Sequence, residues 1–218
     1  CLVTLELTGI TVSFNSAPLE WWLSLPIIVI YPLLFGWVSY QTATKLAEHK
    51  RRLQVMSTRD GMTGVYNRRH WETMLRNEFD NCRRHNRDAT LLIIDIDHFK
   101  SINDTWGHDV GDEAIVALTR QLQITLRGSD VIGRFGGDEF AVIMSGTPAE
   151  SAITAMLRVH EGLNTLRLPN TPQVTLRISV GVAPLNPQMS HYREWLKSAD
   201  LALYKAKKAG RNRTEVAA

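Results

Sequence analysis

A pair of glycines between two apolar runs constrains the fold of this chain more than any other part of its sequence. One run ends at Ile132 and the other covers residues 140–144, with Gly136-Gly137 between them. This pattern predicts a β-hairpin, because glycine supplies the positive φ angles of a tight turn. Most such turns are only connections. The adjacent carboxylates of Asp138-Glu139 repel each other, however, and a cation between them would relieve that repulsion. We therefore expect a metal and phosphate site at the hairpin tip.

Size and composition narrow the possibilities further. With 218 residues, the chain can form one sizeable domain and an appendage. It begins at Cys1, so we expect it to be part of a longer protein. The formal net charge is only +3 and the basic residues are dispersed, so we expect no nucleic-acid partner. Cys1 and Cys82 have no metal-ligand spacing and form no disulfide framework, which predicts a reducing compartment for the soluble part.

Residues 19–40 have the composition of a transmembrane helix. No residue from 23 to 40 is charged, and the apolar run approaches the roughly 20 residues that a membrane-spanning helix needs. Pro26 and Pro32 are tolerated in such a helix, whereas they disfavour the alternative of a buried core helix in water. Residues 1–14 are also apolar, and we expect them to be the end of an earlier span or a short connection.

The residues that follow this run predict a linker helix. Lys45 and the basic cluster at residues 50–52 indicate the cytoplasmic side of a membrane. Residues 41–56 are rich in helix-forming residues, and their leucine and methionine stripe is typical of a short coiled coil that carries a signal. An ordinary solvated linker helix remains the alternative.

From Ser57 onward, helical and strand patterns alternate along the chain. The run at 91–94 is apolar throughout, which is typical of a strand buried on both faces. Together with the hairpin, the order of the elements predicts a two-layer α/β sheet of the split βαβ kind. The predicted helices cover 68–86, 114–126, 149–166 and 192–209, and a second strand covers 174–182.

Two carboxylates follow the buried strand. The period of two in a strand puts Asp95 and Asp97 on the same face at its end. If the hairpin lies beside this strand, Asp95 can converge with Asp138 and Glu139 on one or two divalent ions. The alternative for Asp97 is a helix N-cap.

Polar side chains further along the chain suit a nucleotide. Lys100 can neutralise phosphate charge, and Asn103 and Asp112 carry the acceptor and donor groups that read a purine edge. Each has a simpler alternative, because Asn103 is also a common loop former and His108 can cap a helix or pack against it. The whole set with its spacings favours the functional interpretation.

These residues resemble the signature motifs of GGDEF-domain diguanylate cyclases. The resemblance covers residues 57–213, and Met62 stands where the family's opening motif usually has leucine. Residues 1–40 resemble the end of a membrane-associated sensor region, as in membrane-anchored enterobacterial members of the family. The motifs are Asp60-Gly61-Met62-Thr63-Gly64, Asp95-x-Asp97-x-Phe99-Lys100-x-x-Asn103-Asp104, Gly107-His108-x-x-Gly111-Asp112, Gly136-Gly137-Asp138-Glu139-Phe140 and Ala199-Asp200-x-Ala202-Leu203-Tyr204-x-Ala206-Lys207-x-x-Gly210-Arg211-Asn212.

The resemblance implies an α/β (α+β), palm-like nucleotidyl-cyclase fold. A central, mainly antiparallel sheet would be flanked by helices and preceded by the transmembrane helix and the linker helix. The implied activity is the condensation of two GTP into cyclic di-GMP by a homodimer that uses Mg²⁺ (or Mn²⁺). The implied location is the bacterial inner (cytoplasmic) membrane, with the catalytic domain in the cytoplasm. The expected parts are a sensor region at 1–40, a signalling helix at 41–56, the cyclase domain at 57–213 and a tail at 214–218.

The same resemblance assigns roles by motif position. Asp138 and Glu139 would be the catalytic pair, and one of them, aligned with Asp138, would be the base for the ribose 3′-hydroxyl. The metal ligands would be Asp95, the Ile96 carbonyl and the same acidic pair. The substrate-binding residues would be Lys100, Asn103, His108, Asp112, Gly136, Gly137, Lys207 and Arg211.

Arg127-Gly128-Ser129-Asp130 matches the family's inhibitory product-binding motif. Alone, it would be explained by an arginine at a helix C-terminus and a loop aspartate. Its position just before the hairpin favours a product-binding site for cyclic di-GMP, with Arg158 as a second arginine. Two other functions stay open, namely a degenerate module that binds GTP or cyclic di-GMP without turnover, and a scaffold or signal receiver. The intact acidic pair and Lys100 favour the enzyme.

Overall fold

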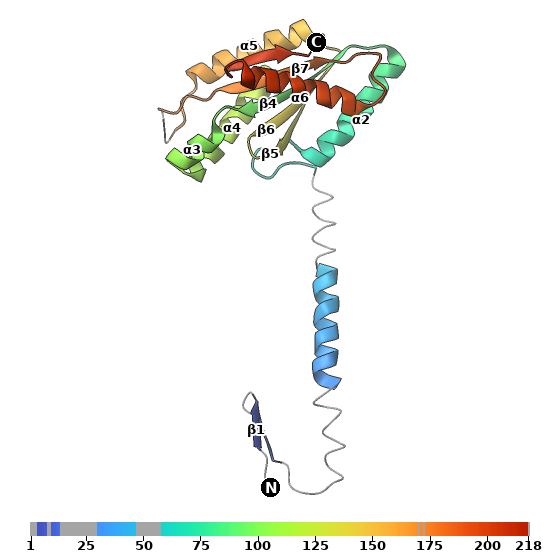
Figure 1. Cartoon of the computed structure of the whole chain (residues 1–218), viewed down its shortest axis with the longest axis vertical. Coiled ribbons are helices and arrows are strands. Elements are labelled where there is room, and N and C mark those ends of the chain that lie inside the picture. The colour runs from blue at the N-terminus through green and yellow to red at the C-terminus, as the bar shows by residue number, and fades with distance from the viewer. Residues whose placement is uncertain are drawn as a thin grey trace. The chain divides into compact units, whose positions relative to one another are not determined.

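The computed structural model describes residues 4–7, 10–13, 30–46, 58–169, 171 and 173–217. The chain divides into two compact units, Cys1–Met56 and Ser57–Ala218, and each is described by itself (Figure 1).

The first unit contains a strand pair and a helix. Strands β1 (Thr4–Leu7) and β2 (Ile10–Ser13) pair antiparallel within the range 1–14 that we expected to end an earlier span or to form a short connection. Residues 30–46 form one helix that runs across the expected boundary between the span and the linker helix.

Among the described residues, no helix combines the length and the apolar character that a bilayer crossing requires. Residues 19–29 of the predicted span lie outside the described part of the chain, as does most of the predicted coiled-coil stripe.

The second unit is built on one six-stranded sheet, in the order β3-β5-β6-β4-β7-β8. The pairings between β5, β6, β4 and β7 are antiparallel, whereas β3 and β8 join the two edges in parallel. The sheet is therefore mixed, with its antiparallel pairs at the centre. The elements are β3 (Tyr66–Asn67), α2 (Arg68–His85), β4 (Ala89–Ile96), α3 (Phe99–Trp106), α4 (His108–Thr125), β5 (Val131–Gly136), β6 (Glu139–Ser145), α5 (Ala149–Thr165), β7 (Ile178–Pro184), α6 (Tyr192–Lys208) and β8 (Arg213–Val216).

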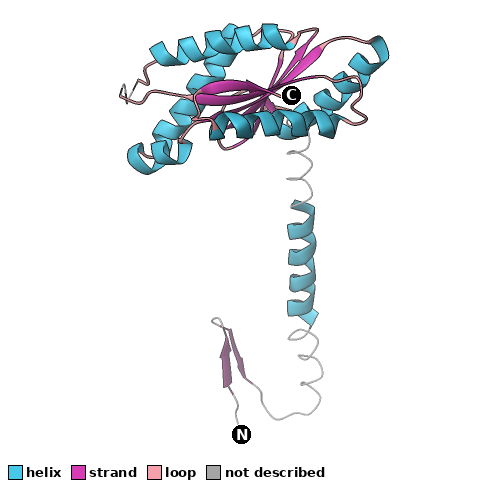
Figure 2. Cartoon of the chain, turned by 45° about the horizontal axis from the view of Figure 1, so that its top comes forward, coloured by secondary structure: helices cyan, strands magenta, loops and turns pink. Residues whose placement is uncertain are grey.

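Strand β4 lies at the centre of the sheet, and all of its residues are buried. Leu92 and Ile94 belong to the core under α4 and α5, whereas Leu91 and Ile93 belong to the core under α2 and α6. Figure 2 shows helices on both sides of the sheet. The prediction of a strand buried on both faces is confirmed, because alternate side chains of β4 fill two cores.

Several elements differ from the expected boundaries. Residues 99–106 form helix α3, and α4 begins at His108, six residues earlier than predicted. The apolar residues Phe99, Ile102 and Trp106 of α3 have helical spacing, but this helix has only eight residues and none of them is fully buried. Strand β7 begins at Ile178 rather than 174. Residues 213–216, part of which were expected in a tail, form β8 through pairing with β7.

Candidate active site

The hairpin of β5 and β6 lies beside β4, as expected. In the antiparallel register of β4 and β6, Asp95 is the direct partner of Glu139. The main-chain N–H of Ile96 donates to the Asp138 carbonyl oxygen over 3.3 Å. Sheet pairing therefore brings Asp95 and the acidic pair to the same end of the two central strands.

The hairpin turn is shifted by one residue from the expected one. Strand β5 continues to Gly136 and β6 begins at Glu139, so the turn residues are Gly137 and Asp138. Both glycines have positive φ angles, 148° for Gly136 and 50° for Gly137. These angles are readily accessible to glycine and rare for other residues, so the turn explains why both positions are glycine.

Arg134 holds this turn from inside the hairpin. Its Nε and Nη2 donate to the Gly137 carbonyl oxygen over 3.1 and 2.8 Å. Its Nη1 forms an ion pair with Asp60 Oδ1 at 3.1 Å. Burial tends to raise the pKa of Asp60, but hydrogen bonds from Thr63 and the Arg134 guanidinium hold it below its usual value. The opening motif of the domain is therefore tied to the hairpin tip.

Asp95 meets a cation of the protein itself. Its Oδ2 lies 2.7 Å from Lys207 Nζ at the end of α6. Burial raises the pKa of Asp95, the Lys207 ammonium opposes that rise, and the charges of Asp138 and Glu139 add to it. The carboxylate therefore stands in a negative, partly desolvated environment that a cation stabilises.

The donor chemistry of this group suits a hard divalent ion. Asp95, Asp138, Glu139 and the Ile96 carbonyl offer only oxygen ligands, which Mg²⁺ prefers. Within the part of the chain that the structure describes, no three His, Cys, Asp or Glu side chains converge as a metal-holding group. Asp95, Asp138 and Glu139 thus fit Mg²⁺ in charge and donor type. In this structure the Asp95 carboxylate forms its ion pair with Lys207.

Asp97 does not cap a helix, and the N-cap alternative is wrong. It is 5% exposed, and its Oδ1 accepts from the Ser179 hydroxyl over 2.6 Å. Its Oδ2 accepts from the main-chain N–H of Asn212 over 2.8 Å. The carboxylate thus joins β4 to β7 and to the turn that precedes β8.

Helices α3 and α4 bring Asn103 against the start of α4. A Cβ atom at Gly111 would lie 1.9 Å from Asn103 Oδ1, so only glycine leaves room for this side chain. Asn103 Oδ1 is buried and has no hydrogen-bond partner among the residues that the structure describes. An unpaired buried acceptor costs free energy, which a donor from a ligand would recover. Lys100 and His108 are exposed on the same two helices.

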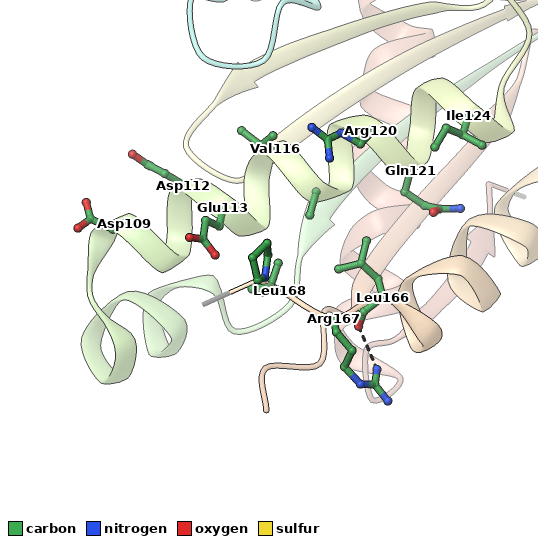
Figure 3. Close-up of a pocket in the computed structure, with 12 residues that line it drawn as sticks. Asp109, Asp112, Glu113, Val116, Arg120, Gln121, Ile124, Leu166, Arg167 and Leu168 are labelled. Atoms are coloured by element: carbon green, nitrogen blue, oxygen red, sulfur yellow. Dashed lines mark hydrogen bonds between the residues drawn. The ribbon is translucent and has the colours of Figure 1, made fainter. Parts of the chain in front are cut away.

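Asp112 lines a cavity of about 510 Å³ along α4, whose other wall is residues 166–169. Figure 3 shows Asp112 near the start of α4 and Leu168 across from that helix. The cavity is not the catalytic centre, because Asp95 and the acidic pair do not line it.

Arg127, Asp130 and Arg158 line one cavity of about 340 Å³. The fold brings Arg158, on α5, to the Arg127–Asp130 turn that follows α4. The main-chain N–H of Arg127 donates to Asp130 Oδ2 over 2.9 Å, and burial raises the pKa of Asp130. Arg127 and Asp130 also border a second cavity of about 220 Å³, which Arg59 and Tyr66 line as well.

Sequence reasoning missed several residues at the site. Asp60 belongs to the opening motif and Arg134 stands just before the glycine pair, but their ion pair joins positions far apart in the chain. Asp200 is a further carboxylate near the hairpin, since burial and the charge of Glu139 raise its pKa while Arg68 opposes the rise. Its position inside the closing motif was the available signal.

Comparison with known proteins identifies the family. The family model described as diguanylate cyclase, GGDEF domain, matches residues 57–213. This chain belongs to the GGDEF family. Diguanylate cyclase DosC of Escherichia coli (strain K12) is 35% identical over 159 residues, which cover 72% of this chain and 34% of DosC. Cyclic di-GMP phosphodiesterase NbdA of Pseudomonas aeruginosa is 30% identical over 193 residues, which cover 83% of this chain and 25% of NbdA. The chain thus spans about a third or less of these two GGDEF relatives.

Solved structures share the fold. The GGDEF domain of DgcB from Caulobacter crescentus, crystallised in complex with c-di-GMP, superimposes with a TM-score of 0.70 at 30% identity. The match covers 74% of this chain and 96% of that domain. The palm-like α/β fold with a mixed central sheet flanked by helices is therefore that of a GGDEF domain.

Proposed function

We propose that this chain is a diguanylate cyclase that condenses two GTP into cyclic di-GMP and two pyrophosphates. The observation that carries the proposal is the register of β4 and β6, in which Asp95 and Glu139 are direct partners beside Asp138. Lys207 adds a cation at 2.7 Å from Asp95. Family membership over residues 57–213 and the intact motifs support the same activity.

The acidic cluster is the proposed metal site. Asp95, the Ile96 carbonyl, Asp138 and Glu139 would hold Mg²⁺ (or Mn²⁺). Such an ion would supply Lewis-acid activation of the 3′-hydroxyl and charge stabilisation for the leaving pyrophosphate. One member of the Asp138-Glu139 pair would accept the hydroxyl proton.

The remaining residues orient the nucleotide. Lys100, Lys207 and Arg211 would bind phosphates, and Lys207 would then exchange Asp95 for a phosphate oxygen. Gly136 and Gly137 have no side chain to obstruct the α-phosphate and ribose. Asn103 and Asp112 would read guanine with His108 nearby, and the unpaired Asn103 acceptor supports this role.

The reaction requires a homodimer. One domain holds one GTP, whereas the product joins two, so two half-sites must face each other across a two-fold axis. Each 3′-hydroxyl would then attack the α-phosphate of the other nucleotide in line.

Product inhibition is proposed at Arg127, Asp130 and Arg158. Their common cavity of about 340 Å³ supports a site for the guanine and phosphate groups of cyclic di-GMP. The GGDEF domain of DgcB, a solved structure of the same fold, is in complex with c-di-GMP, which supports this proposal.

The first unit is proposed to tether the enzyme to the bacterial inner membrane, with the cyclase domain in the cytoplasm, as in membrane-anchored enterobacterial cyclases. The uncharged run at 23–40 and the basic residues after it support this arrangement. Reconstitution of the chain into vesicles, followed by extraction with carbonate or with detergent, tests the tether.

A module that binds nucleotide without turnover is the second candidate. The observation behind this candidate is the match to NbdA, because this GGDEF relative is named as a phosphodiesterase and not as a cyclase.

A turnover measurement decides between the cyclase and the binding module. The 218-residue chain is incubated with GTP and Mg²⁺, and cyclic di-GMP and pyrophosphate are quantified. Two pyrophosphates per cyclic di-GMP are expected, and binding without either product would overturn the proposal.

A further inference from the structure

We infer that Asp97 is a positioning residue, whose buried carboxylate fixes the turn after α6 so that Arg211 is presented to the nucleotide phosphates beside Lys207. The inference rests on the proposed function, which makes Lys207 and Arg211 the phosphate ligands. It gives the second aspartate of the motif a role distinct from that of Asp95.

Both carboxylate oxygens of Asp97 accept hydrogen bonds from the protein, and one of these bonds comes from the turn after α6. The side chain is 5% exposed, and a charge so buried is stable only when hydrogen bonds satisfy it. Ser179 Oγ donates to one oxygen over 2.6 Å, and Asn212 N–H donates to the other over 2.8 Å. Both oxygens therefore have a protein donor, and bonds to a charged acceptor are the stronger kind.

The turn that Asp97 holds has an unusual backbone. Arg211 and Asn212 have φ angles of 62° and 46°, and two successive non-glycine residues in this region are strained unless their surroundings fix them. Arg211 N–H donates to the Ala206 carbonyl oxygen over 3.0 Å. The backbone of Arg211 is thus bound to α6 on one side and, through Asn212, to Asp97 on the other.

The two carboxylates at the end of β4 hold both ends of one segment. Asp95 binds Lys207 Nζ at 2.7 Å, and Asp97 binds the amide of Asn212 at 2.8 Å. Arg211 lies between these anchors, and its side chain is exposed. An arginine whose backbone is already fixed loses less conformational entropy when it binds phosphate. Asp97 can therefore improve phosphate binding by Arg211 without contacting the ligand itself.

The segment after Asn212 has a contact with helix α5. His160 Nε2 of α5 lies 3.3 Å from Thr214 Oγ1 in β8, two residues after Asn212. The main chain of Asn212 is therefore held by Asp97, and the strand that follows it is joined to α5.

Kinetics of three variants of the 218-residue chain test the inference. Asp97→Ala should raise KM for GTP by about tenfold and change kcat by less than about threefold, since a phosphate contact made throughout the reaction is weakened. Asp97→Asn should recover most of this loss, because an amide can accept from Asn212 and donate to Ser179. Arg211→Ala should raise KM by a similar factor.

The decisive measurement is the double-mutant cycle. In the Arg211→Ala background, Asp97→Ala should change KM by less than about twofold, because the contact it serves is already gone. The same cycle is measured as the Kd for the α,β-methylene analogue of GTP, which does not depend on turnover. Multiplicative effects of the two substitutions would overturn the inference, because they would mean that Asp97 acts only on general stability.

Two controls keep the outcome interpretable. If thermal unfolding shows that Asp97→Ala is not folded at the assay temperature, Ser179→Ala replaces it, and the same non-additivity with Arg211→Ala is required. An inactive parent chain that still binds the analogue would overturn the proposed function, whereas the binding cycle would continue to test Asp97. An active parent with unchanged KM in Asp97→Ala would overturn only the inference.

Discussion

The guanidinium of Arg134 pairs with the carboxylate of Asp60 at 3.1 Å and so ties the opening motif to the hairpin that carries the acidic pair. The same guanidinium donates twice to the Gly137 carbonyl oxygen, at the centre of the turn. Removal of one side chain therefore releases both motifs.

Arg134→Ala should lower the free energy of unfolding by about 2 kcal/mol, the usual scale for partly buried hydrogen bonds to charged groups. Turnover should fall as well, because the hairpin turn loses the two hydrogen bonds that Arg134 donates to the Gly137 carbonyl oxygen. Urea unfolding and pyrophosphate release measure the two effects. Glu215→Gln is the matched control, since its ion pair with Arg213 is longer, 3.7 Å, and exposed. An equal loss of stability in both variants would contradict the special role of Arg134.

The acidic pair should be essential for chemistry and less important for binding. Asp138→Asn or Glu139→Gln should lower turnover by at least about 10²-fold, because each removes charge that holds the metal and stabilises the transition state. Binding of the methylene analogue of GTP should persist through Asn103, Asp112 and Lys100. Near-normal product formation by both variants would refute the assignment of the metal site.

Gly111→Ala tests the contact between α3 and α4. The added Cβ would lie 1.9 Å from Asn103 Oδ1, so the predicted guanine reader must move. We expect kcat/KM for GTP to fall by about tenfold or more, with weaker discrimination against ATP. Gly36→Ala is the control, because a Cβ at that position has open space. Unchanged selectivity in Gly111→Ala would separate Asn103 from base recognition.

Arg127→Ala should remove product inhibition and leave the initial rate nearly unchanged. The reason is that Arg127 lines a cavity with Asp130 and Arg158, whereas Asp138 and Glu139 do not line it. Progress curves with and without added cyclic di-GMP measure this. Arg120→Ala, which removes an exposed arginine earlier on α4, should remain inhibited like the parent. Equal inhibition of the Arg127 variant would show that the inhibitory site lies elsewhere.

The pH dependence of stability should reveal His160. Burial lowers the pKa of His160 below its usual value near 6.5, while Asp97 and Asn212 oppose the shift. The unfolded chain therefore takes up this proton first, so stability is full above pH of about 6.5 and is lost as pH falls through the folded pKa. His160→Gln should flatten this loss in urea unfolding between pH 7.5 and 5.5, and an unchanged slope would contradict the assignment to His160.

Much of the fold could be predicted because its signals are local. The apolar run of β4, the amphipathic pattern of α2 and the glycine pair of the hairpin each fix an element without reference to the rest of the chain. Helix α3 offers a shorter signal, because only its apolar residues at 99, 102 and 106 carry the helical spacing and the helix has eight residues. Strand β8 exists through its pairing with β7, which no pattern within its four residues encodes.

The residues of the site divide in the same way. Asp95, Asp138 and Glu139 could be grouped once the hairpin was assumed to lie beside the buried strand. The partners of Asp97 could not be predicted, because Ser179 and Asn212 reach it only through the register of β7 and the turn after α6. Likewise, the pairing of Lys207 with Asp95 depends on how α6 packs across the sheet.

The Arg127–Asp130 turn has a practical consequence for inhibitor design. It forms a wall common to two cavities, one with Arg158 and a smaller one of about 220 Å³ with Arg59 and Tyr66. A drug-like compound bound in the smaller cavity would contact this turn and would have no need to resemble a nucleotide. Such a compound would not compete with cellular GTP, so a high intracellular GTP concentration would not reduce its potency.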